Sequence, residues 1–207
     1  MLVHNPEVER LDKRKLEILM ENLEIPDKLD STLEQYFTDP SLAASIIFHA
    51  YYRGDVRNKV VADLGAGNGI FSYGMSMLGA KEIYAVEKDQ NLADSISRNC
   101  MFMNVNVINA DVRDFRKKVD TVIMNPPFGS VVPHSDLPFM EVALEYASVI
   151  YSIHNEKSRK FVRDFYFKRG LILGEYKIEI LLKKFYDYQD RKYVRLPAVL
   201  FVVRPGK

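Results

Sequence analysis

The chain has 207 residues, a formal net charge of +1 and 47% hydrophobic residues, so it can bury one sizeable core in a single domain. Its one cysteine, Cys100, excludes a disulfide framework and a cysteine-based zinc site. No apolar run approaches the roughly 18 residues that a membrane helix needs, and the N-terminus is too charged for a signal peptide, so we expect a soluble cytoplasmic protein.

The first predicted elements are helices. Residues 7–23 are charged with apolar residues interspersed, which predicts an amphipathic helix. A second helix is expected over residues 41–52, with Thr38 or Asp39 as its N-cap and Pro40 in its first turn. Strand-like and helix-like stretches then alternate. The expected strands cover residues 59–64, 81–87, 105–109, 119–124 and 148–154. The expected helices between them cover residues 69–78, 89–103 and 137–147.

The end of the chain departs from this alternation. A basic helix is expected over residues 156–170, and two β-rich runs follow it over 171–185 and 192–203. Because no helix separates these two runs, they are predicted to form an antiparallel pair that closes one edge of the sheet. Alternating strands and helices elsewhere indicate a parallel sheet covered by helices on both faces.

These elements predict one α/β domain with a mostly parallel seven-stranded sheet. Residues 1–55 would form an N-terminal helical cap, residues 56–155 the core, and residues 156–207 a basic helix and β-hairpin. Residues 1–150 carry 15 basic and 22 acidic residues, whereas residues 151–207 carry 14 and 6. A basic C-terminal quarter is consistent with a nucleic-acid footprint and equally with an unevenly charged, solvated surface.

The stretch VVADLGAGNGI has the pattern of a strand, a tight glycine turn and the start of a helix. Gly65 and Gly67 let the backbone pass close to a ligand, and ligands of open α/β sheets bind at the carboxyl ends of the strands. The dinucleotide fingerprint would need glycine where Ile70 stands. Asp63, just ahead of the turn, would repel a pyrophosphate but suits a ligand with an ammonium group.

Acidic residues also follow the next two predicted strands. Glu87 ends the second strand, 20 residues past Gly67, where an acid binds ribose hydroxyls. Asp111 follows the third strand and could accept a hydrogen bond from an adenine amino group. An ammonium group, a ribose and an adenine together describe S-adenosylmethionine. The alternative is an ordinary βα turn with scattered surface acids. His4 and His49 have no identifiable partners, so we expect no metal site.

The fourth strand is followed by Asn-Pro-Pro-Phe, residues 125–128, which cannot continue a strand because proline has no N–H to donate. Methylation of an exocyclic adenine amine needs two acceptors for its N–H groups, and the Asn125 side-chain oxygen and the Pro126 carbonyl could supply them. Pro127 would keep this segment rigid, and Phe128 could stack on the base. The alternative is a plain Asn-Pro turn with an exposed phenylalanine.

Several sequence blocks resemble the class I methyltransferases with an Asn-Pro-Pro-Phe signature. The likeness is strongest to the methyltransferase-like protein 5 family of RNA adenine-N6 methyltransferases and covers roughly residues 30–155. The blocks that carry it, in the order of that family, are LEQYFT (33–38), VADLGAGNG (61–69), the acid at 87, NADV (109–112), NPPFG (125–129) and YSIH (151–154).

The resemblance implies a Rossmann-like fold, S-adenosylmethionine as cofactor and a role for each matching residue. Those implied to close over the methionine end of the cofactor are Gln35, Tyr36 and Thr38. Those implied to line its backbone cradle are Gly65, Asn68 and Ile70, while Glu87 would hold the ribose and Asp111 and Val112 the adenine. Asn125, Pro126, Pro127 and Phe128 would hold the target base. In this chain Asn68 stands where cysteine is common, and Glu87 where aspartate is usual.

The leading hypothesis is methylation of adenine N6 in RNA, with ribosomal RNA as the expected substrate and a single-stranded or looped adenine as the target. A small zinc-binding activator protein is a further partner that the resemblance implies. Three alternatives stay open: methylation of a glutamine amide in a protein, methylation of adenine in DNA, and a non-catalytic RNA-binding assembly module. His154 is expected to be a satisfied core histidine, and His134 a surface residue.

Overall fold

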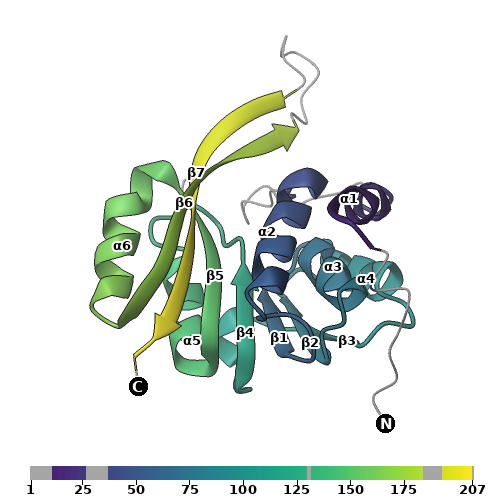
Figure 1. Cartoon of the computed structure of the whole chain (residues 1–207), viewed down its shortest axis with the longest axis horizontal. Coiled ribbons are helices and arrows are strands. Elements are labelled where there is room, and N and C mark those ends of the chain that lie inside the picture. Colours follow the sequence, from purple (N-terminus) through teal and green to yellow (C-terminus); the bar gives the residue numbers. More distant parts are fainter. Residues whose placement is uncertain (1–10, 27–36, 130–131, 184–192, 207) are drawn as a thin grey trace.

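The computed structural model describes residues 11–26, 37–129, 132–183 and 193–206 (Figure 1). Its helices are α1 Lys13–Glu21, α2 Pro40–Tyr52, α3 Ile70–Met77, α4 Gln90–Asn99, α5 Leu137–Tyr146 and α6 Arg159–Phe167, with short 3-10 turns at η3 Val112–Asp114 and η4 Glu156–Ser158. Its strands are β1 Val60–Leu64, β2 Glu82–Glu87, β3 Val105–Asn109, β4 Val119–Met124, β5 Ala147–Asn155, β6 Gly170–Lys183 and β7 Tyr193–Pro205.

The seven described strands form one sheet in the order β3-β2-β1-β4-β5-β7-β6. The first five strands of this order run parallel to one another. β7 is antiparallel to both of its neighbours, β5 and β6. The prediction of a mostly parallel sheet closed by an antiparallel pair is therefore confirmed. The strand order reverses at β1, which pairs with β2 on one side and β4 on the other.

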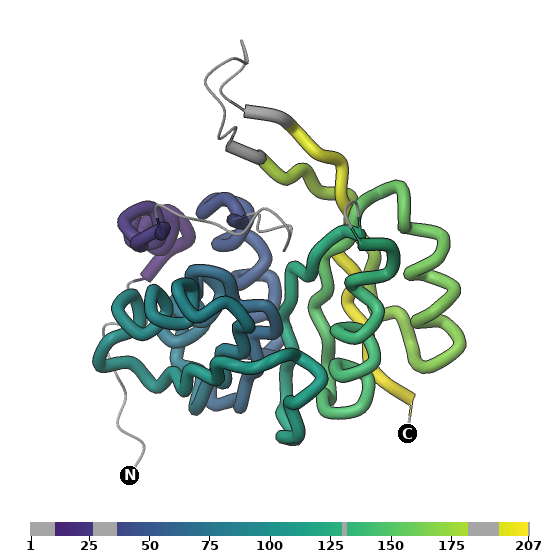
Figure 2. Tube along the Cα trace, turned by 180° about the vertical axis from the view of Figure 1, so that it is seen from behind, coloured from purple at the N-terminus to yellow at the C-terminus, as the bar shows by residue number. Residues whose placement is uncertain are grey.

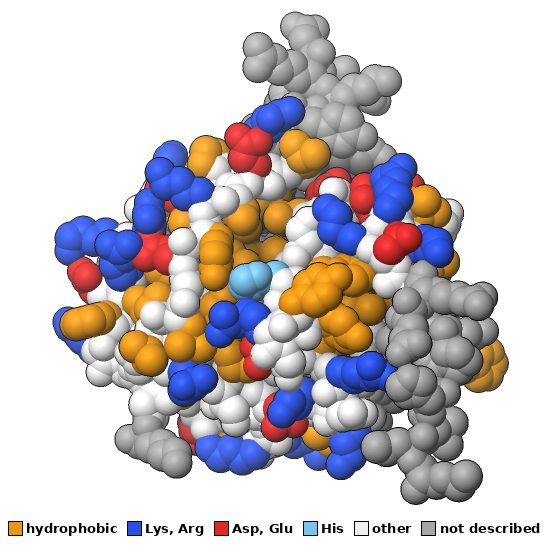
Figure 3. Space-filling model, in the orientation of Figure 1, with side chains coloured by type: hydrophobic (Ala, Val, Ile, Leu, Met, Phe, Trp, Pro, Cys, Tyr) orange, Lys and Arg blue, Asp and Glu red, His pale blue; other side chains and the backbone are white. Residues whose placement is uncertain are grey.

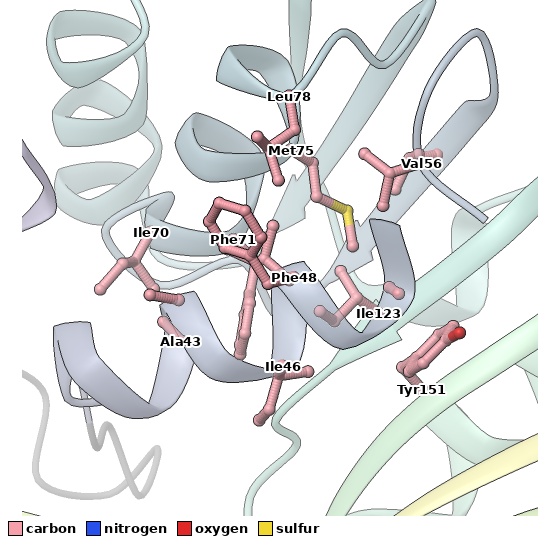
Figure 4. Packing of buried hydrophobic residues seen from close by; sticks show 14 of the residues in the cluster. Ala43, Ile46, Phe48, Val56, Ile70, Phe71, Met75, Leu78, Ile123 and Tyr151 are labelled. Atoms are coloured by element: carbon pink, nitrogen blue, oxygen red, sulfur yellow. The ribbon is translucent and has the colours of Figure 1, made fainter. Parts of the chain in front are cut away.

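Helices cover both faces of the sheet. α1 to α4 lie on one side, and α5 and α6 on the other (Figures 1 and 2). On the first side, Phe48 of α2 packs with Phe71 and Met75 of α3 above the sheet residues Ile123 and Tyr151 (Figure 4). On the other side, a second buried cluster joins α5 and α6 to the opposite face of the same strands. Two-sided burial explains why nearly every position of β1 and β4 is buried and why most of their residues are apolar.

Local signals set the helix ends. Asp39 caps α2, because its side chain accepts hydrogen bonds from the backbone N–H groups of Ser41 and Leu42. α4 ends at Asn99 rather than at the expected residue 103. Phe102 has a φ of 65°, a left-handed conformation that cannot continue a right-handed helix. No helix in the described part of the chain is long and apolar enough to cross a membrane.

The start of β6 leaves no room for a side chain. A Cβ at Gly170 would lie 2.4 Å from the carbonyl oxygen of Arg204 in the paired strand β7. Because the contact is with a backbone atom, relieving it would require β6 and β7 to move apart, which costs free energy. We expect Gly170→Ala to lower the free energy of unfolding by about 1–3 kcal/mol, measured by urea denaturation. The matched control is Leu171→Ala, at the next position, where the side chain is 59% exposed and a change within about 0.5 kcal/mol is expected.

Candidate active site

A cleft of about 270 Å³ opens at the carboxyl ends of β1, β2 and β4, where the strand order reverses. This is the place where ligands bind in open α/β sheets. Eight of the site residues predicted from the sequence line the cleft, and they come from four separate segments. These residues are Gly65, Gly67, Glu87, Asp111, Val112, Asn125, Pro126 and Pro127.

The glycine turn after β1 forms one wall. Gly65 and Gly67 have φ values of 71° and 58°, in the left-handed region that favours glycine. The N–H of Gly65 donates to the carbonyl of Val86 at 2.9 Å, which fixes the turn against the end of β2. A Cβ at Gly65 would lie 3.0 Å from the ring of Phe139, whereas at Gly67 it would meet nothing within 4 Å. A side chain at Gly65 would therefore be crowded by Phe139, whereas the space beside Gly67 is open. A ligand can approach the backbone of the turn at Gly67.

Glu87 joins this turn to the next helix. Its Oε2 accepts from the N–H of Gly67 at 2.9 Å, and its Oε1 accepts from the N–H of Asp89 at 3.0 Å. Burial raises the pKa of Glu87, and these backbone hydrogen bonds oppose that rise. Each carboxylate oxygen can accept a second hydrogen bond, so Oε1 and Oε2 of Glu87 both stay available to the hydroxyls of a ribose.

Asp63 lies deeper than expected. It does not line the cleft and is 1% exposed, and its Oδ2 accepts from the backbone N–H and the hydroxyl of Ser72 at 3.0 and 2.7 Å. Its Oδ1 is buried and has no hydrogen-bond partner within the described residues. Burial raises the pKa of Asp63 to about 7, and the negative charge of Glu87 adds to the rise. An Oδ1 without a partner in the described chain and a carboxylate destabilised by burial favour a cationic partner, which would stabilise the ionised form.

Asn125 directly follows β4 and lines the cleft. Its Nδ2 donates to the hydroxyl of Thr38 at 3.0 Å, although 87 residues separate the two in sequence. The hydrogen bond fixes which way the amide points, so Oδ1 is the atom left free. Oδ1 is buried without a partner among the described residues. Asn125 therefore offers an oriented acceptor beside Pro126 and Pro127, and its contact with a target base stays a prediction.

Thr38 is buried and does not line the cleft, so its contact with Asn125 can be tested alone. We expect Thr38→Val to lower kcat about 3- to 10-fold, because the Asn125 amide loses its orienting partner. Thr38→Ser keeps the hydroxyl and should retain activity. Steady-state kinetics measure kcat, and calorimetric titration measures the cofactor Kd. A rise in cofactor Kd with kcat unchanged would contradict the positioning role and support contact with the methionine end of the cofactor.

The far end of the cleft carries Asp111 and Val112. Asp111 caps η3 through a hydrogen bond from the N–H of Arg113 at 3.0 Å, and the Arg113 side chain pairs with it at 3.1 Å. The Nζ of Lys88 lies 4.0 Å from the same carboxylate. Asp111 thus lies where the sequence placed it, next to the end of β3, but within a small charged network rather than alone.

Some predicted site residues lie away from the cleft. Asn68 and Ile70 are buried behind the glycine turn, where the Asn68 carbonyl accepts from the Asn99 amide at 2.9 Å. Phe128 is partly buried against the apolar cluster of α1 to α3 and is not a wall of the cleft, so its stacking on a base stays a prediction. Gln35 and Tyr36 lie outside the described residues.

Sequence reasoning missed much of the apolar lining. The missed apolar residues are Phe37, Val86, Leu92, Ala110, Val132, Pro138 and Phe139, and the missed polar ones are Lys88, Arg113 and Ser135. The available signal was position: Leu92 opens the helix after Glu87, and Pro138 and Phe139 open the helix after the Asn-Pro-Pro-Phe segment. Nothing in their spacing distinguishes them from ordinary core residues.

His154 is a satisfied core histidine, as expected. It is 1% exposed, its Nδ1 lies 3.0 Å from Asp136 Oδ2, and its Nε2 contacts the hydroxyl of Ser152. Asp136 immediately precedes α5, so this pair ties the segment after the two prolines to β5. His134 is exposed, as predicted.

This sheet order, with a glycine turn after the first strand, an acid ending the second and Asn-Pro-Pro-Phe after the fourth, defines a class I methyltransferase. A family model described as the methyltransferase small domain matches residues 44–141. The crystal structure of PH1948 from Pyrococcus horikoshii superposes with a TM-score of 0.88 and 34% identity, covering 95% of this chain and 99% of that one.

Two relatives of known sequence match most of this chain, and the second of them identifies the family. An uncharacterized protein of Methanocaldococcus jannaschii is 33% identical over 92% of this chain and 93% of its own length. The Drosophila melanogaster protein named rRNA N(6)-adenosine-methyltransferase Mettl5 is 35% identical over 74% of this chain and 78% of its own length. The chain belongs to the Mettl5 family of methyltransferases.

Proposed function

We propose that this chain methylates the N6 amine of adenine in RNA, with ribosomal RNA as substrate and S-adenosylmethionine as methyl donor. The observation that carries the proposal is the buried Oδ1 of Asn125, which has no hydrogen-bond partner among the described residues and lies beside the two prolines that line the cleft. The Drosophila relative is named for this reaction on ribosomal RNA, which supports the same substrate here.

The residues present fit S-adenosylmethionine. Glu87 offers its carboxylate to the ribose hydroxyls, Asp111 and the backbone of Val112 flank the adenine, and the open front of Gly67 admits the middle of the molecule. Asp63 Oδ1 suits the ammonium group, because it is an acceptor without a partner in the described chain. Gln35 and Tyr36 are proposed to contact the methionine end. When bound, S-adenosylmethionine supplies a methyl group on a cationic sulfur.

The target amine needs orientation more than activation. Its lone pair is delocalised into the adenine ring, and two acceptors on its N–H groups turn it toward the methyl carbon. Asn125 Oδ1 and the Pro126 carbonyl are the proposed acceptors, and proline fixes the backbone that aims that carbonyl. When the amine nitrogen gains the methyl group, the carbon–sulfur bond of the donor would break to leave a neutral thioether. The nitrogen would release one proton to water, so no strong base is required. Holding the reactants in line is the main contribution of the protein.

The test is incubation of the protein with labelled S-adenosylmethionine and unmodified ribosomal RNA transcribed in vitro, followed by mass spectrometry of the nucleosides. The reaction is run with the chain alone and with a zinc-binding activator protein, because the family resemblance implies such a partner. The expected product is N6-methyladenosine in RNA. Label in protein that resists nuclease would favour the glutamine alternative, and label in added DNA the DNA alternative. Absence of cofactor binding by calorimetry would favour a non-catalytic RNA-binding module.

A further inference from the structure

The first turns of α6 and the segment 132–134 form one surface beside the cleft. β5 ends at Asn155, and α6 begins after the single turn η4, at the same edge of the sheet as the cleft. Val132 is a wall of the cleft and is 56% exposed. His134, two residues on, lies with its ring 5.4 Å from that of Phe161 in α6. The surface is therefore continuous with the proposed base-binding site.

The aromatic pair on this surface is open to solvent. Phe161 is 41% exposed and His134 is exposed, so two ring systems meet outside the core. His134 has a φ of 61°, a left-handed conformation that is unusual for a residue other than glycine. The buried side of α6 is formed by Val162, Phe165 and Tyr166, and the Phe161 ring lies 6.2 Å from that of Phe165 at the border of this buried side.

Basic side chains surround this pair. Residues 156–169 contain six basic and two acidic residues. Arg159 and Arg163 both pair with Glu175, and Arg159 also pairs with Glu156 at 3.1 Å, so two carboxylates largely compensate these two charges. Lys157 is exposed, and the side chain of Lys160 is 90% exposed and pairs with Asp164 at 2.7 Å. Figure 3 shows Lys and Arg side chains gathered over α6, interspersed with hydrophobic and a few acidic side chains.

We infer that this surface docks the single-stranded RNA next to the target adenine, an inference that rests on the proposed function. Phe161 and His134 form a platform for a neighbouring base, because aromatic rings stack on bases without regard to sequence. Lys157 and Lys160 contact the phosphates on either side of that base. Continuity with the cleft through Val132 favours RNA over a separate protein partner, since the target strand must leave the cleft along some path.

The experiment measures affinity for a fluorescein-labelled single-stranded RNA with one central adenine, by anisotropy over a salt series. Phe161→Ala is expected to weaken binding about 5- to 100-fold, and Phe161→Tyr to restore it. The double variant Lys157→Gln/Lys160→Gln is expected to weaken binding about 10-fold at low salt and to flatten the salt dependence. The matched control is Lys81→Gln/Lys117→Gln, two exposed lysines that precede β2 and β4 at the opposite edge of the sheet. It should change RNA affinity less than about twofold.

Two further readouts separate this inference from the proposed function. Cofactor Kd and kcat at saturating RNA should stay at wild-type values in every surface variant, while KM for RNA rises. Absence of N6-methyladenosine after incubation with the wild-type protein would contradict the proposed function. Wild-type protein that is active, with RNA affinity unchanged in both Phe161→Ala and the lysine double variant, would overturn the docking surface alone and assign this face to another class of partner.

Discussion

Replacing Asn125 by alanine is expected to lower kcat by about 10²- to 10³-fold while cofactor Kd stays within about twofold, because the lost atom is an oriented acceptor for the target amine. The amide is held by Thr38 at 3.0 Å, so its Oδ1 needs no rearrangement when the base arrives. Single-turnover methylation of RNA and calorimetric titration of the cofactor measure the two quantities separately.

The matched variant is Asn125→Asp. It keeps an acceptor oxygen in the same place, and the Thr38 hydroxyl can rotate to donate to the other oxygen. We expect Asn125→Asp to retain more activity than Asn125→Ala by at least about tenfold. Equal losses in the two variants would contradict the acceptor role. Loss of cofactor affinity in step with turnover would place Asn125 in cofactor binding instead.

The sheet could be predicted because its signals are local. Apolar runs such as β1 and β4 alternate with amphipathic stretches, and parallel sheets covered on both faces have that pattern. The acids at the strand ends could also be predicted, because the carboxyl ends of parallel strands meet at one edge of the sheet. Glu87 and Asp111 accordingly lie in the same cleft as Asn125.

Contacts between distant segments could not be predicted. The hydrogen bond between Thr38 and Asn125 and the ring of Phe139 behind Gly65 each depend on how a loop returns over the sheet. The direction of Phe128 was equally hidden, because a residue after two prolines can face the cleft or the core. The Phe128 side chain packs on the core cluster, and no feature of the neighbouring sequence indicates whether it should face the core or the cleft.

Replacing Asp63 by asparagine is expected to weaken S-adenosylmethionine binding at pH 7 by at least about 30-fold, because the ammonium group of the proposed cofactor would lose its buried carboxylate partner. Asparagine can still accept from Ser72 through its carbonyl oxygen, so the start of α3 should stay in place.

The same substitution is expected to raise the free energy of unfolding at pH 7, although it weakens cofactor binding. The pKa of Asp63 is about 7 in the folded chain, above its ordinary value of 3.8, so the folded chain binds the proton more tightly than the unfolded chain. Wild-type stability therefore falls as pH rises from about 4 to 7, and the variant lacks this loss.

The pH dependence of binding isolates this carboxylate. A cationic ligand favours ionised Asp63, so binding releases a proton below pH 7, and wild-type Kd should fall by up to about tenfold per pH unit between about pH 5.5 and 7. The ammonium of the ligand stays protonated over this window, and the Asp63→Asn variant should give a nearly flat profile. 5′-Methylthioadenosine, which has neither the ammonium nor the sulfonium, should give the same profile with both proteins, because any contribution of Glu87 to ribose binding is common to the two. A wild-type profile as flat as that of the variant would mean that Asp63 only holds the glycine turn against α3, and the cationic end of the donor would then need another anion.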